Sequence, residues 1–262
     1  MQVINITDRF KIQINGRGHA YFLDDKPMIG NTTALGVIAK PFLIQWAADV
    51  AAANAIGIVP EYESVMAIKD AKEKKKAKDA LDEKYPKFKE ARTAHMKKKE
   101  AGGDWGKIVH KAIEMWISSG SIPLEVECDG EMYKVEEGHM NAINHFVKWS
   151  QDNNVKFLES EKRVYSEKNW FAGTLDLVFE MDGKRWIGDI KTSGAIYNEH
   201  FFQMGGYEIC LEEMGEGNVD GYLVINLKKD GTMDLKMAEN REVNKEAFKH
   251  ALELHKIIST LE

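Results

Sequence analysis

The sequence predicts an α/β protein with a central mixed sheet flanked by helices. Strand-like runs over 156–166, 169–180 and 184–193 follow one another as a meander, and helical patterns stand on both sides of them. The composition of 44% hydrophobic and 10% aromatic residues is sufficient for a large core. A length of 262 residues then favours one large domain over 1–262 that carries an insertion.

The amino-terminal region is expected to alternate short strands with helices. Strand-like runs occupy 3–6, 11–16 and 19–25, the last with a turn at its end. Thr32 or Thr33 is expected to cap a short helix through 33–39, because a threonine hydroxyl can accept a hydrogen bond from the first turn. Pro41 then opens a second helix through 42–57.

Residues 61–100 form a Lys-rich stretch that we interpret as a helical insertion or arm. The stretch holds 13 Lys and Arg against 9 Asp and Glu, although the whole chain has a net charge of −6. It has few large apolar residues, which is typical of a solvated helix. Contact with nucleic-acid phosphates is the alternative reading. Gly102-Gly103 is expected to end it.

The second half of the chain supplies the remaining helices and strands. Asp104 is expected to cap a helix over 105–118, whose apolar residues recur with the helical period. The other expected elements are helices over 135–153, 199–214 and 244–261, strands over 219–227 and 232–238, and a hairpin turn over 181–183.

Composition also limits the class of protein. Cys128 and Cys210 are too few for a disulfide framework, which favours a reducing compartment. Residues 1–16 lack the apolar core of a signal peptide, and no apolar run approaches the ~20 residues of a membrane helix. These features predict a soluble, cytoplasmic protein that has no membrane partner.

Two acids stand inside apolar strand-like runs, where carboxylates are unusual. Asp176 and Asp189 belong to the two strands of the expected hairpin, so pairing should bring them close together. Two neighbouring carboxylates repel each other, and a divalent cation such as Mg²⁺ or Mn²⁺ relieves this repulsion. Lys191 has the parity of Asp189 and should emerge on the same face, about 7 Å further along. A cation and a lysine together suit phosphodiester hydrolysis.

Three sequence patterns resemble the PD-(D/E)XK nuclease superfamily, in particular its RecB-like and phage-type branch. These are Gly-Thr-Leu-Asp176 followed by Asp189-Ile-Lys-Thr-Ser, Gly106-Lys-Ile-Val-His110, and Gln203-Met-Gly-Gly-Tyr207. The resemblance spans most of 28–210. Leu175 stands where the superfamily signature has proline, a form that is common in this branch. The cysteines that hold an iron–sulfur cluster in some members are lacking here.

The resemblance implies a restriction-endonuclease-like core in a single nuclease domain, with roles for individual residues. It implies Lys191, Asp176 and Asp189 as catalytic residues, and His110, Asp176, Asp189 and the Ile190 carbonyl as ligands of Mg²⁺ or Mn²⁺. It implies Gln203 and Tyr207 as substrate-binding residues, and Glu161 as an additional acid of the site. Glu114, one helical turn after His110, is either a supporting acid or a solvated one.

The function that follows is a metal-dependent deoxyribonuclease, most simply an exonuclease in recombination, repair or phage DNA processing. DNA is the expected partner, with a helicase or a recombination protein as a further candidate. Two alternatives stay open: an endonuclease on the same core, and a catalytically silent DNA-binding or assembly module. For single residues, His110 could be an ordinary helix–sheet histidine, and Asp176 with Lys191 a surface ion pair.

Overall fold

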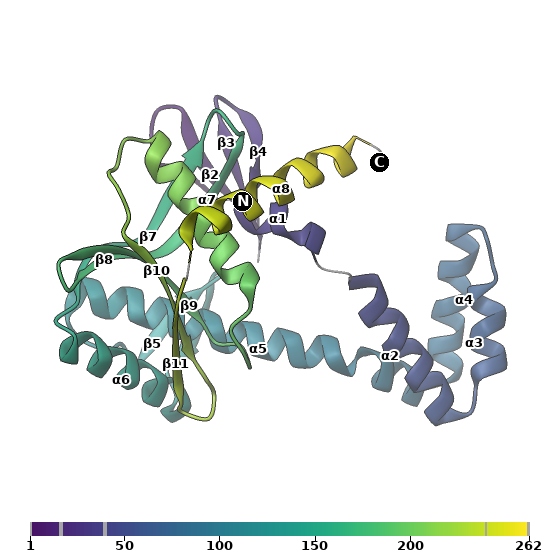
Figure 1. The fold of residues 1–262 in the computed structure, drawn as a ribbon. Coiled ribbons are helices and arrows are strands. Elements are labelled where there is room, and N and C mark those ends of the chain that lie inside the picture. The colour runs from purple at the N-terminus through teal and green to yellow at the C-terminus, as the bar shows by residue number, and fades with distance from the viewer. Residues whose placement is uncertain (1, 16–17, 39–40, 239, 261–262) are drawn as a thin grey trace. The chain divides into compact units, whose positions relative to one another are not determined.

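A computed structural model describes residues 2–15, 18–38, 41–238 and 240–260 (Figure 1). The chain divides into two compact units. The first, here called the sheet unit, combines the residues up to Ile38 with those from Trp105 onward. The second, here called the helical unit, is Ala39–Asp104 and is inserted between these two parts.

The helical unit has a hydrophobic core of its own. Its elements are α2 (Pro41–Ile56), α3 (Val59–Met66), α4 (Ala71–Lys84) and the first part of α5 (Pro86–Ser119). Ala53 of α2, Tyr62 of α3 and Phe88 of α5 are buried against one another in this core. The unit therefore includes α2 as well as the 61–100 stretch that the sequence marked out as an insertion.

The expected helix end at Gly102-Gly103 is wrong. Helix α5 runs without a break from Pro86 to Ser119, so Asp104 lies inside the helix and does not cap it. A glycine in a helix interior costs about 1 kcal/mol relative to alanine. Strong helix formers before the pair and a buried apolar face after it offset this cost.

The sheet unit is an α/β structure with a mixed sheet flanked by helices, as the sequence predicted. Its sheet has the order β1-β2-β3-β4-β8-β9-β10-β11, with β7 paired to β8. The strands are β1 (Gln2–Asn5), β2 (Phe10–Asn15), β3 (Gly18–Leu23), β4 (Lys26–Gly30), β7 (Lys156–Ser166), β8 (Phe171–Met181), β9 (Lys184–Lys191), β10 (Gly221–Leu227) and β11 (Met233–Met237). A separate hairpin consists of β5 (Glu125–Cys128) and β6 (Glu131–Lys134).

Helices cover both faces of this sheet (Figure 1). Strand β10 shows it most clearly, because Leu223 and Ile225 pack with α5 and α6 (Glu137–Asp152), whereas Tyr222 and Val224 pack with α7 (Asn198–Glu213) and α8 (Arg241–Ser259). A strand covered on both faces is expected to be mostly apolar, which explains the apolar run over 222–225.

The sequence reading missed β4 and the β5–β6 hairpin, and it misplaced the start of the first helix. Helix α1 (Asn31–Leu35) begins after Gly30, which has no side chain to cap it, so neither Thr32 nor Thr33 is the cap. No helix in the described part of the chain combines the length and the apolar character needed to cross a membrane.

Strand β8 creates an opening in the sheet. It pairs with β7 along one edge, and along the other it pairs with β4 at Phe171 and Ala172 and with β9 from Leu177 to Met181. Residues 173–176 lie between these two partners, without a ladder partner on that edge among the described strands. We call this opening the fork, and the candidate site lies beside it.

Candidate metal centre

Asp176 lies at the point where β8 and β9 separate. The last ladder pair between the two strands joins Leu177 to Gly188. Beyond it, the Asp176 carboxylate replaces the ladder, because its Oδ2 accepts a hydrogen bond of 2.7 Å from the Ile190 N–H. A charged acceptor makes this bond stronger than a neutral one. The Asp176 side chain is therefore fixed by the backbone of the neighbouring strand.

Glu161 lies opposite Asp176 across the β7–β8 pair. The register joins Ser160 to Leu177 and Lys162 to Leu175, which leaves Glu161 and Asp176 facing each other between these pairs. Glu161 has a φ of 50°, in the left-handed region, although it is in the middle of a strand. Such a backbone is uncommon for glutamate and costs about 1–3 kcal/mol, and it is typical of functional sites.

Helix α5 brings His110 to the same place. A Cβ atom on Gly106 would lie 2.8 Å from Thr192 Oγ1, so the glycine allows the helix to pass close to the end of β9. His110 follows one turn later, with its Nδ1 3.7 Å from Asp176 Oδ2. One potential ligand atom from each of His110, Glu161 and Asp176 lies within 4.8 Å of the other two.

The electrostatics of this cluster favour neutral forms of two groups. Burial, together with the charges of Asp176 and Glu114, raises the pKa of Glu161 to about 8. Burial lowers the pKa of His110, an effect that Asp176 partly offsets and Lys191 reinforces. A neutral imidazole has a free nitrogen lone pair, which is the form that binds a metal.

The buried Asp189 and the half-buried Lys191 form an ion pair next to this cluster. The Lys191 ammonium donates a 2.6 Å hydrogen bond to Asp189 Oδ1, and the Asp189 side chain is only 2% exposed. Burial and the Asp176 charge raise the pKa of Asp189 to about 7, although Lys191 acts in the opposite direction. Burial alone would lower the pKa of Lys191. The negative charges of Asp189 and Asp176 outweigh this effect, so the pKa of Lys191 is raised.

Gln203 and Tyr207 of α7 continue from Lys191 as a hydrogen-bonded chain. Gln203 Oε1 accepts a 3.4 Å hydrogen bond from the lysine, and Gln203 Nε2 donates a 2.7 Å bond to the Tyr207 hydroxyl. Tyr207 is 3% exposed, and burial raises its pKa well above the ordinary value. The two residues thus restrain the lysine head group, and the buried tyrosine has little surface for a substrate.

The residues of the cluster and the neighbouring Asp189 fit a divalent cation. Asp189 Oδ2 is buried and has no hydrogen-bond partner in the part of the chain that the structure describes. Burying an unpaired carboxylate oxygen is costly, and a cation would satisfy it and lower the repulsion among the acids. Carboxylates suit Mg²⁺ and Mn²⁺, and the imidazole of His110 is an acceptable nitrogen ligand.

The structure distributes the residues that the sequence marked out into two sets. His110, Glu161 and Asp176 form the cluster, although sequence reasoning gave Glu161 only a supporting place. Asp189 is outside the 4.8 Å group and is held by Lys191. The backbone of Ile190 is next to His110 and Asp176. Glu114 is within electrostatic range of Glu161 and is paired with Lys111 at 2.7 Å.

Sequence reasoning missed two residues that position the site. Asn226 of β10 exchanges two hydrogen bonds with the backbone of Ser193, at 3.0 and 3.1 Å, and so fixes the chain just after Lys191. The sequence feature that could have indicated Asn226 is the one that indicated the acids, namely a polar residue inside an apolar run. The Asn31 side-chain amide donates a 3.3 Å hydrogen bond to the backbone carbonyl of Gln203, and no local sequence pattern indicates this contact.

Comparisons with known proteins do not assign the chain to a family. No family model matches it, and no curated protein matches it. Among solved structures, a crystal structure of SSO0001 aligns over 45% of this chain and 59% of that chain, with 16% sequence identity and a TM-score of 0.30. Neither fold nor function is inferred from a likeness at this level.

Proposed function

We propose that the protein is a metal-dependent nuclease that hydrolyses phosphodiester bonds in DNA, most simply as an exonuclease. The observation that carries the proposal is the meeting of His110, Glu161 and Asp176 within 4.8 Å of one another, beside the ion pair of Asp189 and Lys191. The acids and the lysine come from the consecutive strands β7, β8 and β9, and the imidazole comes from helix α5, which lies earlier in the chain. A cross-strand ion pair on a solvated face would not need this convergence.

The proposal includes a restriction-endonuclease-like core of the PD-(D/E)XK type. Its support is the order β7-β8-β9-β10, with α5 on one face and α7 on the other, and the position of the acids where β8 and β9 separate. The sequence patterns around Asp176, Lys191 and Gln203 agree with this arrangement.

In this proposal His110, Glu161 and Asp176 hold Mg²⁺ or Mn²⁺, with Asp189 and the Ile190 carbonyl beside them. The bound cation supplies a Lewis acid for a phosphate oxygen and lowers the pKa of a coordinated water. Glu161 and Asp189 lose their protons when the cation binds, because both have raised pKa values in its absence.

Besides the proposed cation, the Lys191 ammonium provides a positive charge at the site. Its raised pKa keeps the ammonium protonated at neutral pH. Asp189 and Gln203 restrain its head group from two sides, at 2.6 and 3.4 Å. From this position Lys191 can donate a hydrogen bond to an attacking water or to a phosphate oxygen that gains negative charge.

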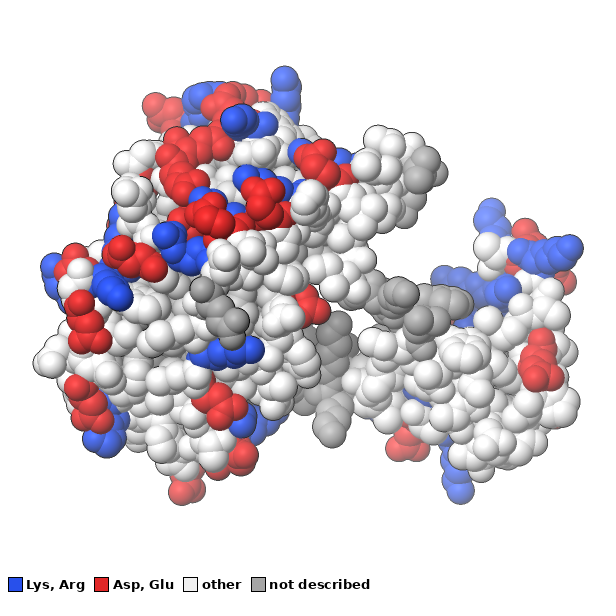
Figure 2. Space-filling model, in the orientation of Figure 1, with Lys and Arg blue, Asp and Glu red and all other residues white. Residues whose placement is uncertain are grey.

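A DNA substrate is further supported by the helical unit. Lysines gather around α4, where Figure 2 shows many basic side chains. Lys72, Lys75 and Lys76 of this helix are exposed and have no ion pair within the described residues. Exposed lysines of this kind bind phosphates through a salt-sensitive, sequence-independent term.

The experiment is digestion of end-labelled linear and closed circular DNA, single- and double-stranded, with Mg²⁺ or Mn²⁺ and with chelator. We expect degradation of linear DNA, loss of activity in chelator, and a decrease of about a hundredfold or more in Lys191→Ala. Lys148→Ala removes an exposed lysine of α6 and is the matched control. Cleavage of closed circles would reassign the protein as an endonuclease, and no cleavage by folded protein with either ion would refute the nuclease proposal.

A further inference from the structure

Strand β11 is a free edge of the large sheet. It is last in the strand order and pairs only with β10 among the described strands. Leu235 and Met237 of this strand are 43% and 51% exposed. An edge with unpaired backbone groups and exposed apolar side chains is a template for another strand.

The pairing with β10 fixes which backbone groups of β11 face outward. Ala238 N–H donates to the Tyr222 carbonyl at 3.1 Å, and Lys228 N–H donates to the Thr232 carbonyl at 2.9 Å. Even-numbered residues of this segment therefore direct their N–H and C=O groups toward β10. Those of the odd-numbered residues, Met233, Leu235 and Met237, are directed toward the free edge, because the direction alternates along a strand.

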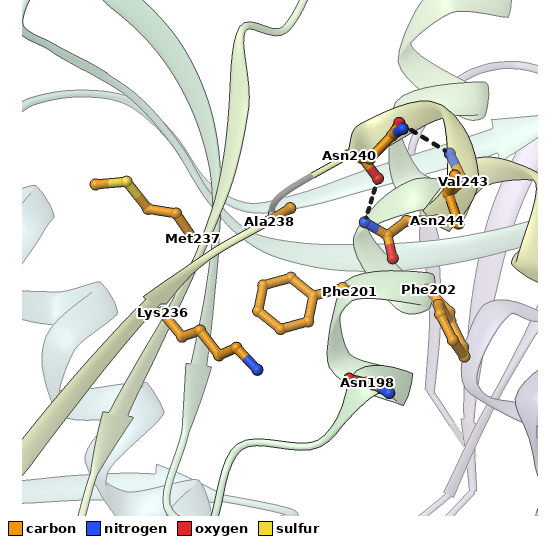
Figure 3. A pocket seen from close by; sticks show the side chains of 9 residues that line it. All are labelled: Asn198, Phe201, Phe202, Lys236, Met237, Ala238, Asn240, Val243 and Asn244. Atoms are coloured by element: carbon orange, nitrogen blue, oxygen red, sulfur yellow. Dashed lines mark hydrogen bonds between the residues drawn. The ribbon is translucent and has the colours of Figure 1, made fainter.

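The side chains of β11 divide into two sets with different chemistry. Asp234 and Lys236 lie on the face covered by α7, and Lys236 Nζ is 5.6 Å from the centre of the Phe201 ring. The apolar residues at 233, 235 and 237 lie on the opposite face. Figure 3 shows Lys236 and Met237 pointing to different sides of the strand. The strand thus carries one acid and one base two residues apart.

We propose that β11 pairs with β11 of a second copy of this chain, antiparallel about a two-fold axis at Leu235. Leu235 is then opposite Leu235 of the other copy, and Met233 is opposite Met237. On the other face, Asp234 of each copy is opposite Lys236 of the other. Each outward-facing N–H and C=O gains a partner, and both cross-strand charge pairs are of opposite sign.

The charge pattern argues for a second copy over other extended partners. A lysine alone on an edge strand keeps other strands away, whereas a lysine and an aspartate symmetric about the central residue make the edge complementary to itself. The free edge of β7 lacks this symmetry. It carries a register shift near Glu159 and the left-handed Glu161, and both features disfavour pairing. The inference is independent of the proposed nuclease activity.

Charge variants test the pairing by sedimentation velocity over a hundredfold range of protein concentration. The wild type is expected to change from monomer to dimer. Asp234→Lys and Lys236→Asp each place like charges opposite each other, so each should raise the dimer dissociation constant at least about tenfold. An equal mixture of the two variants restores opposite charges and should form a dimer again.

One control addresses the contact that Asp234 makes within its own chain. Lys228 Nζ is 2.6 Å from the Asp234 carboxylate, and Asp234→Lys removes this pair as well. Lys228→Ala removes only the pair within the chain and should dimerise like the wild type. Thermal melting shows whether each variant is folded.

A cysteine at the axis tests the register. Leu235→Cys should form a disulfide-linked dimer on oxidation, because Cα atoms of a hydrogen-bonded antiparallel pair are about 5.5 Å apart, within bridging range. Cys128 and Cys210 are buried and should not compete. Met132→Cys, on an exposed position of β6, is the control that should stay uncrosslinked. A wild type that is monomeric at every concentration, or single charge variants that dimerise as well as the wild type, would overturn the proposal.

Discussion

The sheet unit buries two groups of carboxylates, and the protein treats them differently. Glu208 is 3% exposed, but its carboxylate accepts hydrogen bonds from the Tyr222 hydroxyl and the Arg241 guanidinium, with Lys245 3.9 Å away. Glu161 has no hydrogen bond to its carboxylate among the described residues, and Asp189 Oδ2 has no partner either. Both groups are acidic and buried, but only the first is satisfied within the chain.

This difference is the one that we expect between a structural site and the candidate functional site. Around Glu208 the chain provides opposite charges and donors, so the acid contributes to the fold without help from outside. Around Glu161 the described residues provide no hydrogen bond to the carboxylate, and Asp189 is paired with Lys191 through Oδ1 alone, while burial raises the pKa of both acids. Perturbed pKa values of this kind are typical of functional sites, which agrees with the proposed metal centre.

The largest expected effect comes from Asp176→Asn. The amide removes negative charge from the cluster, so cation binding should fail and nuclease activity should fall by at least about a thousandfold. The measurement is DNA digestion together with the rise in melting temperature on adding Mn²⁺, which should disappear. Asp152→Asn, an exposed acid paired with Lys148, is the control. Full activity in Asp176→Asn would refute the proposed role of Asp176 in cation binding.

Glu208→Ala is the matching change in the structural group. It leaves Arg241 and the Tyr222 hydroxyl without their acceptor, so the free energy of unfolding should fall by about 3 kcal/mol or more. Urea denaturation measures it, and Mn²⁺ should not alter the difference from wild type. Glu212→Ala removes a half-exposed acid paired with Lys245 and should cost less. Equal stability of Glu208→Ala and wild type would show that the charges are not coupled.

Glu161→Gln tests the uncompensated charge through pH. The folded-state pKa of about 8 is above the ordinary 4.5, so between these values the folded protein binds more protons than the unfolded chain. Wild-type stability in chelator should therefore fall as pH rises from about 5 to 8, and Glu161→Gln should reduce this slope to the part that the raised pKa of Asp189 contributes. Above pH 8 the variant should be more stable by about 2 kcal/mol. Glu159→Gln, on the same strand, should keep the wild-type slope.

The smallest expected effect is that of Tyr207→Phe. It removes the hydroxyl that accepts from Gln203 and so loosens the restraint on Lys191. Activity should fall by about tenfold, while the free energy of unfolding changes by about 1 kcal/mol. Tyr85→Phe removes a comparable bond to Glu61 in the helical unit and should leave activity unchanged. An unchanged rate for Tyr207→Phe would limit the residue to packing.

Local patterns predicted the parts of the fold that depend on local physics. The expected strands over 156–166, 169–180 and 184–193 match β7, β8 and β9, and the turn at 181–183 has the left-handed residues Asp182 and Gly183 that a tight hairpin needs. The patterns failed where tertiary contacts decide. Gly102-Gly103 has the sequence of a helix end, but packing on both sides keeps α5 continuous. Strand β4 is short and pairs with distant β8, a pairing that its sequence does not indicate.

The candidate site shows the same limit. The residue types and their order pointed to Asp176, Asp189, Lys191 and His110, because polar groups in apolar runs are conspicuous. Which of them meet depends on backbone details. The register of β7 and β8 sets Glu161 opposite Asp176, and Lys191 holds Asp189 beside them. Neither detail has a signature in the sequence.

The hydrogen bond from the Ile190 amide to Asp176 gives this protein a spectroscopic reporter. An amide proton bonded to a charged carboxylate resonates at a frequency that follows the charge density on the acceptor oxygen. Any ion that binds Asp176 withdraws that density, so one backbone resonance should shift in proportion to occupancy. Occupancy of the centre can thus be followed in ¹⁵N-labelled protein without DNA, and with diamagnetic Mg²⁺ it can be separated from turnover altogether.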